Sequence, residues 1–409
     1  MDARRKKEMK EISDLLSTEL QSKTEQLQLN THLKGVIFPL LRQRMNSMGI
    51  RSFFVRTIAQ YTAECAKKEG IQLHRSPESK LFHTQLPFLA EGIIAVQYYE
   101  NQILDGKGGL YRHEEYQMDR VHNNVIAGHF VKDFLYQYVE DAIFPDDDAG
   151  YRSTMRQLRR IFQLVDLGQA FQDKWGTFEA LNSRKKNVIN ISAEAEAYIK
   201  TEMIAQYWSA VKKQGVQEDM RIFTENYLRR ISITSGALFA LMAELVMDLL
   251  GYHGRERDHI FQFGIHLGMT GQIVNDISDL LPPDYNQSTV SKIPEDAFAD
   301  VRNNNVTLPL IFHFNAHLNS NMQQLDNRRK KSPDMLVKLL QDPVYAARQT
   351  AVIMAEQANE LIPGDSEAAV LLRDLNSITD NNRFFECLEQ AFQRKEKQPD
   401  ERPLAGALS

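Results

Sequence analysis

The segment Phe261–Pro283, FQFGIHLGMTGQIVNDISDLLPP, has the pattern that decides the fold. Its apolar residues recur at the three- and four-residue spacing of a helix face, and two consecutive prolines end the pattern. Near the C-terminal end of this predicted helix, three oxygen-bearing side chains fall within one turn: Asn275, Asp276 and Asp279. Such a cluster suits a hard cation such as Mg²⁺. Acidic residues are also common on solvated helix ends, so spacing alone leaves both interpretations open.

The composition is that of a globular protein. The chain has 409 residues, 43% of them hydrophobic, and a net charge of −5, so it can bury a large core and has no basic field to attract nucleic acid. Its two cysteines are too few for a disulfide framework and suit a reducing compartment. The most apolar window, Ile233–Leu250, contains Glu244 and Asp248 and therefore predicts a buried core helix, with no transmembrane segment. Because the basic N-terminus lacks an apolar signal region, we expect a cytoplasmic protein.

Segments with helical periodicity follow one another along the chain, and strand signals are scarce. Helices are predicted near 4–29, 51–69, 84–105, 233–251 and 255–281, among others. This pattern predicts an all-α fold, most simply one large single-domain helical bundle. We expect a basic helical extension over 1–30, the helical domain over 31–394 and a disordered polar tail over 395–409.

A second predicted helix also ends in oxygen-bearing side chains. The segment 86–109, LPFLAEGIIAVQYYENQILDGKGG, is apolar as far as Tyr99 and then carries Asn101, Gln102 and Asp105 just before a glycine-rich break. Residues at i, i+3 and i+4 share a helix face, so these three side chains can cluster. Two such clusters can face each other across a bundle interior, where metal and cofactor sites are often built. A polar helix end without a function is the alternative.

The order of these features resembles the trans-isoprenyl diphosphate synthase family, the polyprenyl synthetases. Residues 263–279 resemble the family's second aspartate-rich helix, F-G-x-x-L-G-x-x-x-Q-I-x-D-D-x-x-D, and residues 299–311, ADVRNNNVTLPLI, resemble D-L-x-x-G-K-x-T-L-P-L-I. YLRRISITSGALFALMAE lies where the family has K-T-G-x-L, NNVIAGHFVKDFL resembles A-I-L-A-G-D-x-L-L, and Val165–Gln169 resembles a stretch ending in G-Q. The resemblance covers roughly residues 31 to 394 and implies the class I isoprenoid synthase bundle with a central apolar cavity.

The resemblance also implies a chemistry and a set of site residues. In this family Mg²⁺ held by two aspartate-rich helices helps an allylic prenyl diphosphate to ionise, and isopentenyl diphosphate attacks the resulting cation. The implied metal ligands are Asn101, Gln102, Asp105, Asn275, Asp276 and Asp279, of which Asp105, Asp276 and Asp279 are the implied catalytic acids. The implied contacts to the substrate diphosphate are Arg51, Arg112, Gln272 and Thr234. The implied pocket residues are Val96, Tyr98, Tyr99 and Gln169, and the implied assembly is a homodimer or a heterodimer with a prenyl synthase.

The chain departs from the family at both sites. The first motif, D-D-x-x-D in the family, keeps one carboxylate, Asp105, and amide carbonyls at Asn101 and Gln102 add no charge. In the pocket for isopentenyl diphosphate, the G-K-R-x-R segment keeps Arg51, while two family lysines are replaced by Thr234 and Asn305. Each lost charge-assisted contact removes about 1.5–3 kcal/mol of binding.

Three hypotheses are consistent with this combination. The first is an enzyme that ionises one allylic prenyl diphosphate, followed by cyclisation, elimination or prenyl transfer, as in a terpene synthase or a prenyltransferase. The second is a non-catalytic regulatory subunit of a heteromeric prenyl diphosphate synthase. The third is a divergent chain-elongating synthase. A helical scaffold without an active site is a fourth interpretation outside isoprenoid chemistry.

Overall fold

The computed structural model describes residues 3–27, 29, 34–35, 37–38, 41–42, 45, 49–104, 120–175, 201–280, 298–317 and 320–376. All regular elements within these ranges are helices, in agreement with the predicted all-α class. The end of the predicted domain and the predicted tail lie outside the described residues, so the domain boundaries stay predictions.

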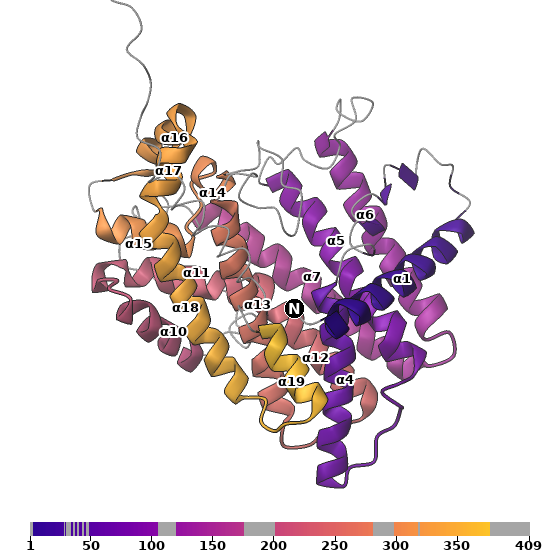
Figure 1. Cartoon of the computed structure of the whole chain (residues 1–409). Helices are drawn as coiled ribbons and strands as arrows, with labels where there is room; N and C mark the ends of the chain where they lie inside the picture. Colours follow the sequence, from indigo (N-terminus) through magenta and orange to yellow (C-terminus); the bar gives the residue numbers. More distant parts are fainter. Residues whose placement is uncertain are drawn as a thin grey trace, which may run out of the picture.

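Helix α13 (Arg257–Asp279) is the predicted helix 255–281, and it lies in the middle of the bundle (Figure 1). Most of its apolar residues are buried, including Phe263, Ile273 and Ile277, as the periodicity predicts. It contacts α11 (Arg221–Ile231), α12 (Ala237–Leu250), α14 (Ala299–Arg302), α15 (Leu308–Ala316), α18 (Gln341–Glu360) and α19 (Glu367–Asn376). A helix surrounded in this way can bring its polar C-terminal turn into the interior.

The other half of the bundle is built around α5 (Leu86–Leu104), which is the predicted helix 84–105. It contacts α4 (Ile50–Glu69), α6 (Arg120–Tyr138) and α7 (Asp148–Trp175). The described chain also contains the α-helices α10 (Thr201–Lys213), α16 (Met322–Lys331) and α17 (Pro333–Leu339), and the short segments η1 (Leu81–Gln85), η3 (Val139–Ile143) and η4 (Glu218–Met220). The ends of α5 and α13 that carry the two predicted polar clusters belong to different halves of one bundle.

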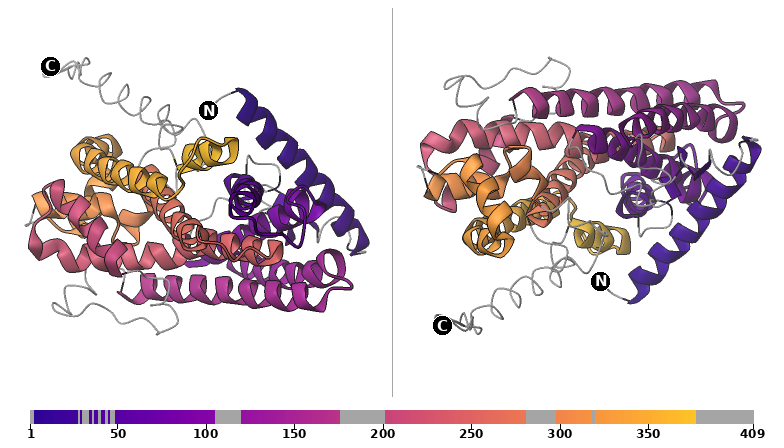
Figure 2. Two further views of the ribbon diagram at one scale, coloured as in Figure 1. Left: turned by 90° about the horizontal axis from the view of Figure 1, so that it is seen from below. Right: turned by 90° about the horizontal axis from the view of Figure 1, so that it is seen from above.

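Helix α1 (Ala3–Gln26) runs along the outside of the α4–α5 region (Figure 2). Although the sequence indicates a basic extension, one side of α1 is apolar and buried, through Met9, Ile12, Leu16 and Leu20. The Tyr138 hydroxyl donates to Glu19 Oε1 at 3.0 Å and joins α1 to α6. The N-terminal helix therefore contributes to the same core as the rest of the bundle.

Glycines allow the closest approach in the core, between α13 and the two elements before it. A Cβ atom at Gly268 would lie 2.2 Å from the carbonyl oxygen of Ser235, in the π-helical segment η5 (Ser232–Gly236). At Gly264 it would lie 2.8 Å from the backbone nitrogen and Cα of Ala240 in α12. These contacts are to backbone atoms, so only glycine fits at both positions.

Residues 218–250 form the one described stretch that is long and apolar enough to cross a membrane. Its most apolar window is 78% buried inside the bundle, which is the arrangement of a core helix. The stretch contains α11, η5 and α12, with Glu244 and Asp248 near its end. This burial agrees with the core helix predicted over 233–251.

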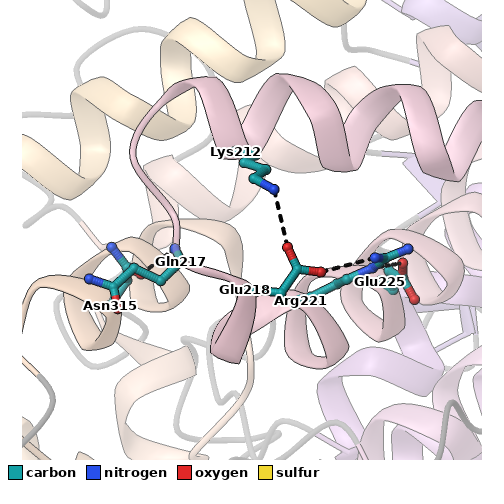
Figure 3. Close-up of polar contacts among 6 residues, drawn as sticks. All are labelled: Lys212, Gln217, Glu218, Arg221, Glu225 and Asn315. Carbon is teal, nitrogen blue, oxygen red and sulfur yellow. Dashed lines mark hydrogen bonds and ion pairs between the residues drawn. The ribbon is translucent and has the colours of Figure 1, made fainter.

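Polar contacts hold the N-terminal end of α11 in place (Figure 3). Glu218 accepts from Lys212 Nζ at 3.2 Å and from Arg221 Nη1 at 2.9 Å, and the Gln217 backbone N–H donates to Asn315 Oδ1 at 2.7 Å. The ion pairs are exposed and each contributes little to stability. Together they connect α10, α11 and α15 at the base of the helix that carries Tyr227 and Arg230.

A buried histidine on α13 is expected to make the free energy of unfolding depend on pH. His266 is hydrogen-bonded through Nδ1 to the Tyr207 hydroxyl, and burial lowers the pKa of His266 to about 4. The unfolded chain therefore binds a proton at higher pH than the folded chain, so this residue makes the protein less stable as pH falls from 6.5 towards 4. We expect urea denaturation to show a contribution of about 2 kcal/mol between pH 7 and pH 5.

The variant His266→Gln tests this expectation, because glutamine keeps a hydrogen-bonding group without a titration in this range. Its free energy of unfolding should fall by about 2 kcal/mol less than that of the wild type between pH 7 and pH 5. His259→Gln, an exposed position on the same helix, is the matched control and should keep the wild-type slope. Equal slopes for the wild type and His266→Gln would contradict the assignment.

Candidate functional site

The C-terminal half of α13 carries a buried carboxylate with fixed hydrogen bonds. Asp276 is 3% exposed. Its Oδ2 accepts from the Tyr227 hydroxyl at 2.7 Å, and its Oδ1 accepts from Gln272 Nε2 at 2.7 Å. Gln272 Oε1 in turn accepts from Ser235 Oγ at 2.9 Å. Residues from α11, η5 and α13 thus hold one carboxylate in a single orientation.

The electrostatics of Asp276 depend on a second acid and one cation. Burial and then the charge of Asp300 raise the pKa of Asp276 to about 6, against the opposing effects of Arg230, Tyr227 and Gln272. Arg230 is itself buried, lies 5.3 Å from the centre of the Tyr227 ring and donates from Nη2 to the carbonyl of Val306 at 3.3 Å. Negative charge at Asp276 is therefore only partly compensated by the protein.

The other two residues of this predicted cluster lie in different environments. Asp279 is buried on the same side of α13 as Asp276, and its carbonyl accepts from the Phe298 backbone N–H at 2.7 Å at the start of α14. Asn275 is exposed. The structure places Asp276 and Asp279 in the interior and Asn275 at the surface. The metal-ligand role of the three residues stays a prediction.

Helix α14 adds an acid that the sequence analysis did not include among the site residues. Asp300 is buried, and its Oδ1 accepts from Asn305 Nδ2 at 3.1 Å. The resemblance covers the segments with Tyr227, Arg230 and Asp300, but the family motif alone did not show that they meet at Asp276. Two features of the sequence could have indicated these residues. Asp300 aligns with the aspartate of D-L-x-x-G-K, and Arg230 is one of two consecutive arginines before an apolar helix.

On the opposite helix, the structure joins two predicted site residues. Gln169 Nε2 on α7 donates to Asn101 Oδ1 on α5 at 2.6 Å. Gln102 lies in α5, but its side chain is outside the described part of the structure, as are Asp105 and Arg112. Asn101 Oδ1, which was predicted to bind metal, thus accepts a hydrogen bond from Gln169, which was predicted to line the pocket.

A carboxyl pair lies beside Asn101. Burial and then Asp166 raise the pKa of Glu100 to about 7, and Lys132 opposes this effect. Burial also raises the pKa of Asp166, whose Oδ2 lies 3.8 Å from Lys132 Nζ. Two interacting carboxyls of this kind titrate as a pair. Asp166 was not predicted from the sequence, because no local pattern connects it to Glu100.

The predicted pocket residues belong mostly to the core. Val96 and Tyr99 are buried, Tyr98 is half-buried, and the Tyr99 hydroxyl donates to the carbonyl of Ile37 at 2.7 Å. Of the predicted diphosphate contacts, Thr234 Oγ1 donates to the carbonyl of Arg230 at 3.1 Å, and the guanidinium of Arg51 lies 5.8 Å from the Phe239 ring centre. Their roles in substrate binding stay predictions.

The donor chemistry around Asp276 suits a hard cation. Carboxylate oxygens are the preferred ligands of Mg²⁺, and Asp276, Asp279 and Asp300 supply them in a buried setting. In the described ranges, no three His, Cys, Asp or Glu side chains are grouped closely enough to hold a metal ion. Asp276 accepts hydrogen bonds from Tyr227 and Gln272, and Asp300 accepts one from Asn305.

Comparison with known proteins places this site in a family. Residues 121–342, more than half of the chain, match the model of the polyprenyl synthetases. No curated protein matches the chain by sequence. Solved structures, however, are similar over nearly their whole length.

One such structure is geranylgeranyl pyrophosphate synthase from Lactobacillus brevis, with 16% identity, coverage of 94% of this chain and 97% of that chain, and a TM-score of 0.58. A second is geranylgeranyl pyrophosphate synthetase from Pyrococcus horikoshii, with 18% identity, 90% and 96% coverage, and a TM-score of 0.57. The polyprenyl synthase of Caulobacter crescentus, crystallised with calcium and isoprenyl diphosphate, has 14% identity, 89% and 96% coverage, and a TM-score of 0.50. At these identities the structures show a shared fold, and the family match adds the chemistry. The chain therefore belongs to the polyprenyl synthetase family, and with it to isoprenoid biosynthesis through prenyl diphosphate chemistry.

Proposed function

We propose that this family member is an enzyme that ionises one allylic prenyl diphosphate, after which the cation cyclises, loses a proton or is transferred to an acceptor other than isopentenyl diphosphate. The observation that carries this proposal is the charge balance around Asp276. Asp276 is buried, the charge of Asp300 adds to the effect of burial in raising its pKa, and Arg230 is a buried cation that opposes this rise. A buried carboxylate whose charge is only partly compensated, as at Asp276, destabilises the chain by itself and favours binding of a divalent cation.

In this proposal Asp276 and Asp279 hold Mg²⁺ from the α13 side, with Asn275 at the surface, and Asn101, Gln102 and Asp105 act from the α5 side. Bound Mg²⁺ supplies positive charge that stabilises the leaving diphosphate. Tyr227 and Gln272 fix the orientation of the Asp276 carboxylate, and Ser235 fixes Gln272. Because its orientation is already fixed, the Asp276 carboxylate would lose little conformational freedom on binding the metal.

The chain lacks two lysines of the family, and this favours a reaction that does not use isopentenyl diphosphate. Two positions that are lysines in the family carry neutral side chains here, and both are bound within the protein. Thr234 donates to the Arg230 carbonyl, and Asn305 donates to Asp300. A second diphosphate therefore lacks contacts that contribute about 1.5–3 kcal/mol each in charge-assisted form.

A specific observation favours the non-catalytic subunit as the second candidate. Asn101, a predicted metal ligand in the weaker motif, already accepts a 2.6 Å hydrogen bond from Gln169. A chain whose first motif is engaged in internal hydrogen bonds can keep the family fold and act on a catalytic partner. A chain-elongating synthase is the third candidate, and it requires binding of a second diphosphate.

Pyrophosphate release separates these candidates. The purified chain, incubated with geranyl, farnesyl or geranylgeranyl diphosphate at millimolar Mg²⁺, is expected to release pyrophosphate and form a hydrocarbon or alcohol without isopentenyl diphosphate. Product analysis by gas chromatography and mass spectrometry checks this expectation. Release that begins only when an active prenyl synthase is added supports the subunit. Release only with isopentenyl diphosphate, together with a longer prenyl diphosphate, supports elongation.

Assembly as a homodimer or as a heterodimer with a prenyl synthase, and a cytoplasmic location, stay predictions from the sequence. Size-exclusion chromatography with light scattering on the chain alone, and then with the synthase, distinguishes the two assemblies.

A further inference from the structure

Arg230 is a buried cation with little bonding to the protein around it. It is 5% exposed, and its Nη2 donates to the carbonyl of Val306 at 3.3 Å. A guanidinium has five N–H donors. Within the described residues, the guanidinium makes this one hydrogen bond, and its charge also acts on Asp276 through space. The face of Tyr227, at 5.3 Å, and the charge of Asp276 stabilise this guanidinium, but a buried charge stays costly unless its remaining donors bond to another group.

Arg230 lies close in the sequence or in space to two positions where the family has lysine, Thr234 and Asn305. It lies one helical turn before Thr234, whose hydroxyl donates to its carbonyl. Its guanidinium donates to Val306, the residue that follows Asn305. The side chain of Arg230 therefore reaches from α11 to the segment before α15, and its charge lowers the pKa of Asp276, the acid that the proposed function assigns to the prenyl diphosphate site.

We propose that Arg230 binds the diphosphate of the prenyl substrate, as a residue that determines affinity for that group; this assignment rests on the proposed function. A guanidinium with unbonded N–H groups can form two parallel hydrogen bonds to phosphate oxygens, a geometry that lysine cannot supply. Arg230 then bonds to the diphosphate on the side away from Val306, while Asp276 and Asp279 act through the metal. Arg230 was not predicted from the sequence, because the family pattern places its cation one helical turn later, at the position of Thr234.

Calorimetric titration of inorganic pyrophosphate into the full chain with Mg²⁺ tests the assignment. Arg230→Gln, with its folding checked by thermal denaturation, is expected to weaken binding about 10- to 100-fold. Arg230→Lys keeps the charge but cannot form two parallel hydrogen bonds, and its affinity for pyrophosphate should be about 3- to 10-fold lower than that of the wild type. Arg229→Gln, at the adjacent and less buried position, is the matched control and should stay within about 3-fold of the wild type.

Unchanged pyrophosphate affinity in folded Arg230→Lys and Arg230→Gln would overturn the assignment, since a purely structural arginine changes stability and not affinity. If Arg230→Gln does not fold, the lysine variant decides alone. The titration needs no turnover, so it can succeed when the proposed function fails. A chain that binds pyrophosphate through Arg230 yet releases none from any prenyl diphosphate would support this assignment and contradict ionisation.

Discussion

Replacing Gly268 with alanine is expected to lower the free energy of unfolding by about 3 kcal/mol or more, an effect at the upper end of overpacking substitutions. The new methyl group would lie 2.2 Å from the carbonyl oxygen of Ser235 and 2.5 Å from its carbonyl carbon. Both are backbone atoms of η5, so rotation of a side chain cannot relieve the overlap. Helix α13 and η5 must move apart, which also breaks the hydrogen bond from Ser235 to Gln272.

The same helix supplies the control for this experiment. A Cβ atom at Gly271 meets nothing within 4 Å, and the position is exposed. Gly271→Ala should therefore raise the free energy of unfolding by up to about 1 kcal/mol, since alanine favours the helix more than glycine does. Urea denaturation of the two variants beside the wild type measures both effects. Similar stability for both variants would contradict the close approach of α13 and η5.

Replacing Asp276 with asparagine is expected to abolish pyrophosphate release and to stabilise the chain without metal at the same time. Burial and Asp300 raise the pKa of Asp276 from 3.8 to about 6. For an acid shifted upward, the folded chain binds the proton more tightly than the unfolded chain does. The charged Asp276 carboxylate therefore lowers the free energy of unfolding. This effect is absent below pH 3.8, grows as pH rises, and is complete above about pH 6. Removing the charge should add on the order of 2–3 kcal/mol at pH 8.

The pH dependence makes this prediction specific. The stability difference between Asp276→Asn and the wild type should shrink as pH falls from 7 towards 4, in urea denaturation without Mg²⁺. Asp258→Asn, at an exposed position in the first turn of the same helix, should lower stability by no more than about 1 kcal/mol, because it loses the interaction of an acid with the helix N-terminus, and should leave activity unchanged. A destabilised Asp276→Asn at pH 8 would show that the carboxylate is well compensated in the fold, which would remove the main support for a cation site there.

Hydrophobic periodicity was sufficient to predict the bundle and its central helix. The predicted helix 255–281 differs from α13 by two residues at each end, because its apolar face and its first and last turns are all local features. The helix predicted over 84–105 corresponds to α5 for the same reason. The glycines of α13 stood in the motif, but the sequence did not show that Gly268 meets the carbonyl of Ser235. That contact joins residues far apart along the chain.

The sequence by itself determined the all-α fold, the family and the two polar helix ends, because these depend on side chains a few residues apart. Only the tertiary structure decided which of those side chains lie in the interior and what surrounds them. Asn275, Asp276 and Asp279 are equivalent by spacing, yet the neighbours of α13 leave Asn275 exposed and bury the two aspartates. The partners of Asp276, which are Tyr227, Arg230 and Asp300, come from two other helices. Burial and charge act through space, so the pKa of this carboxyl is a property of the packed bundle and not of its motif.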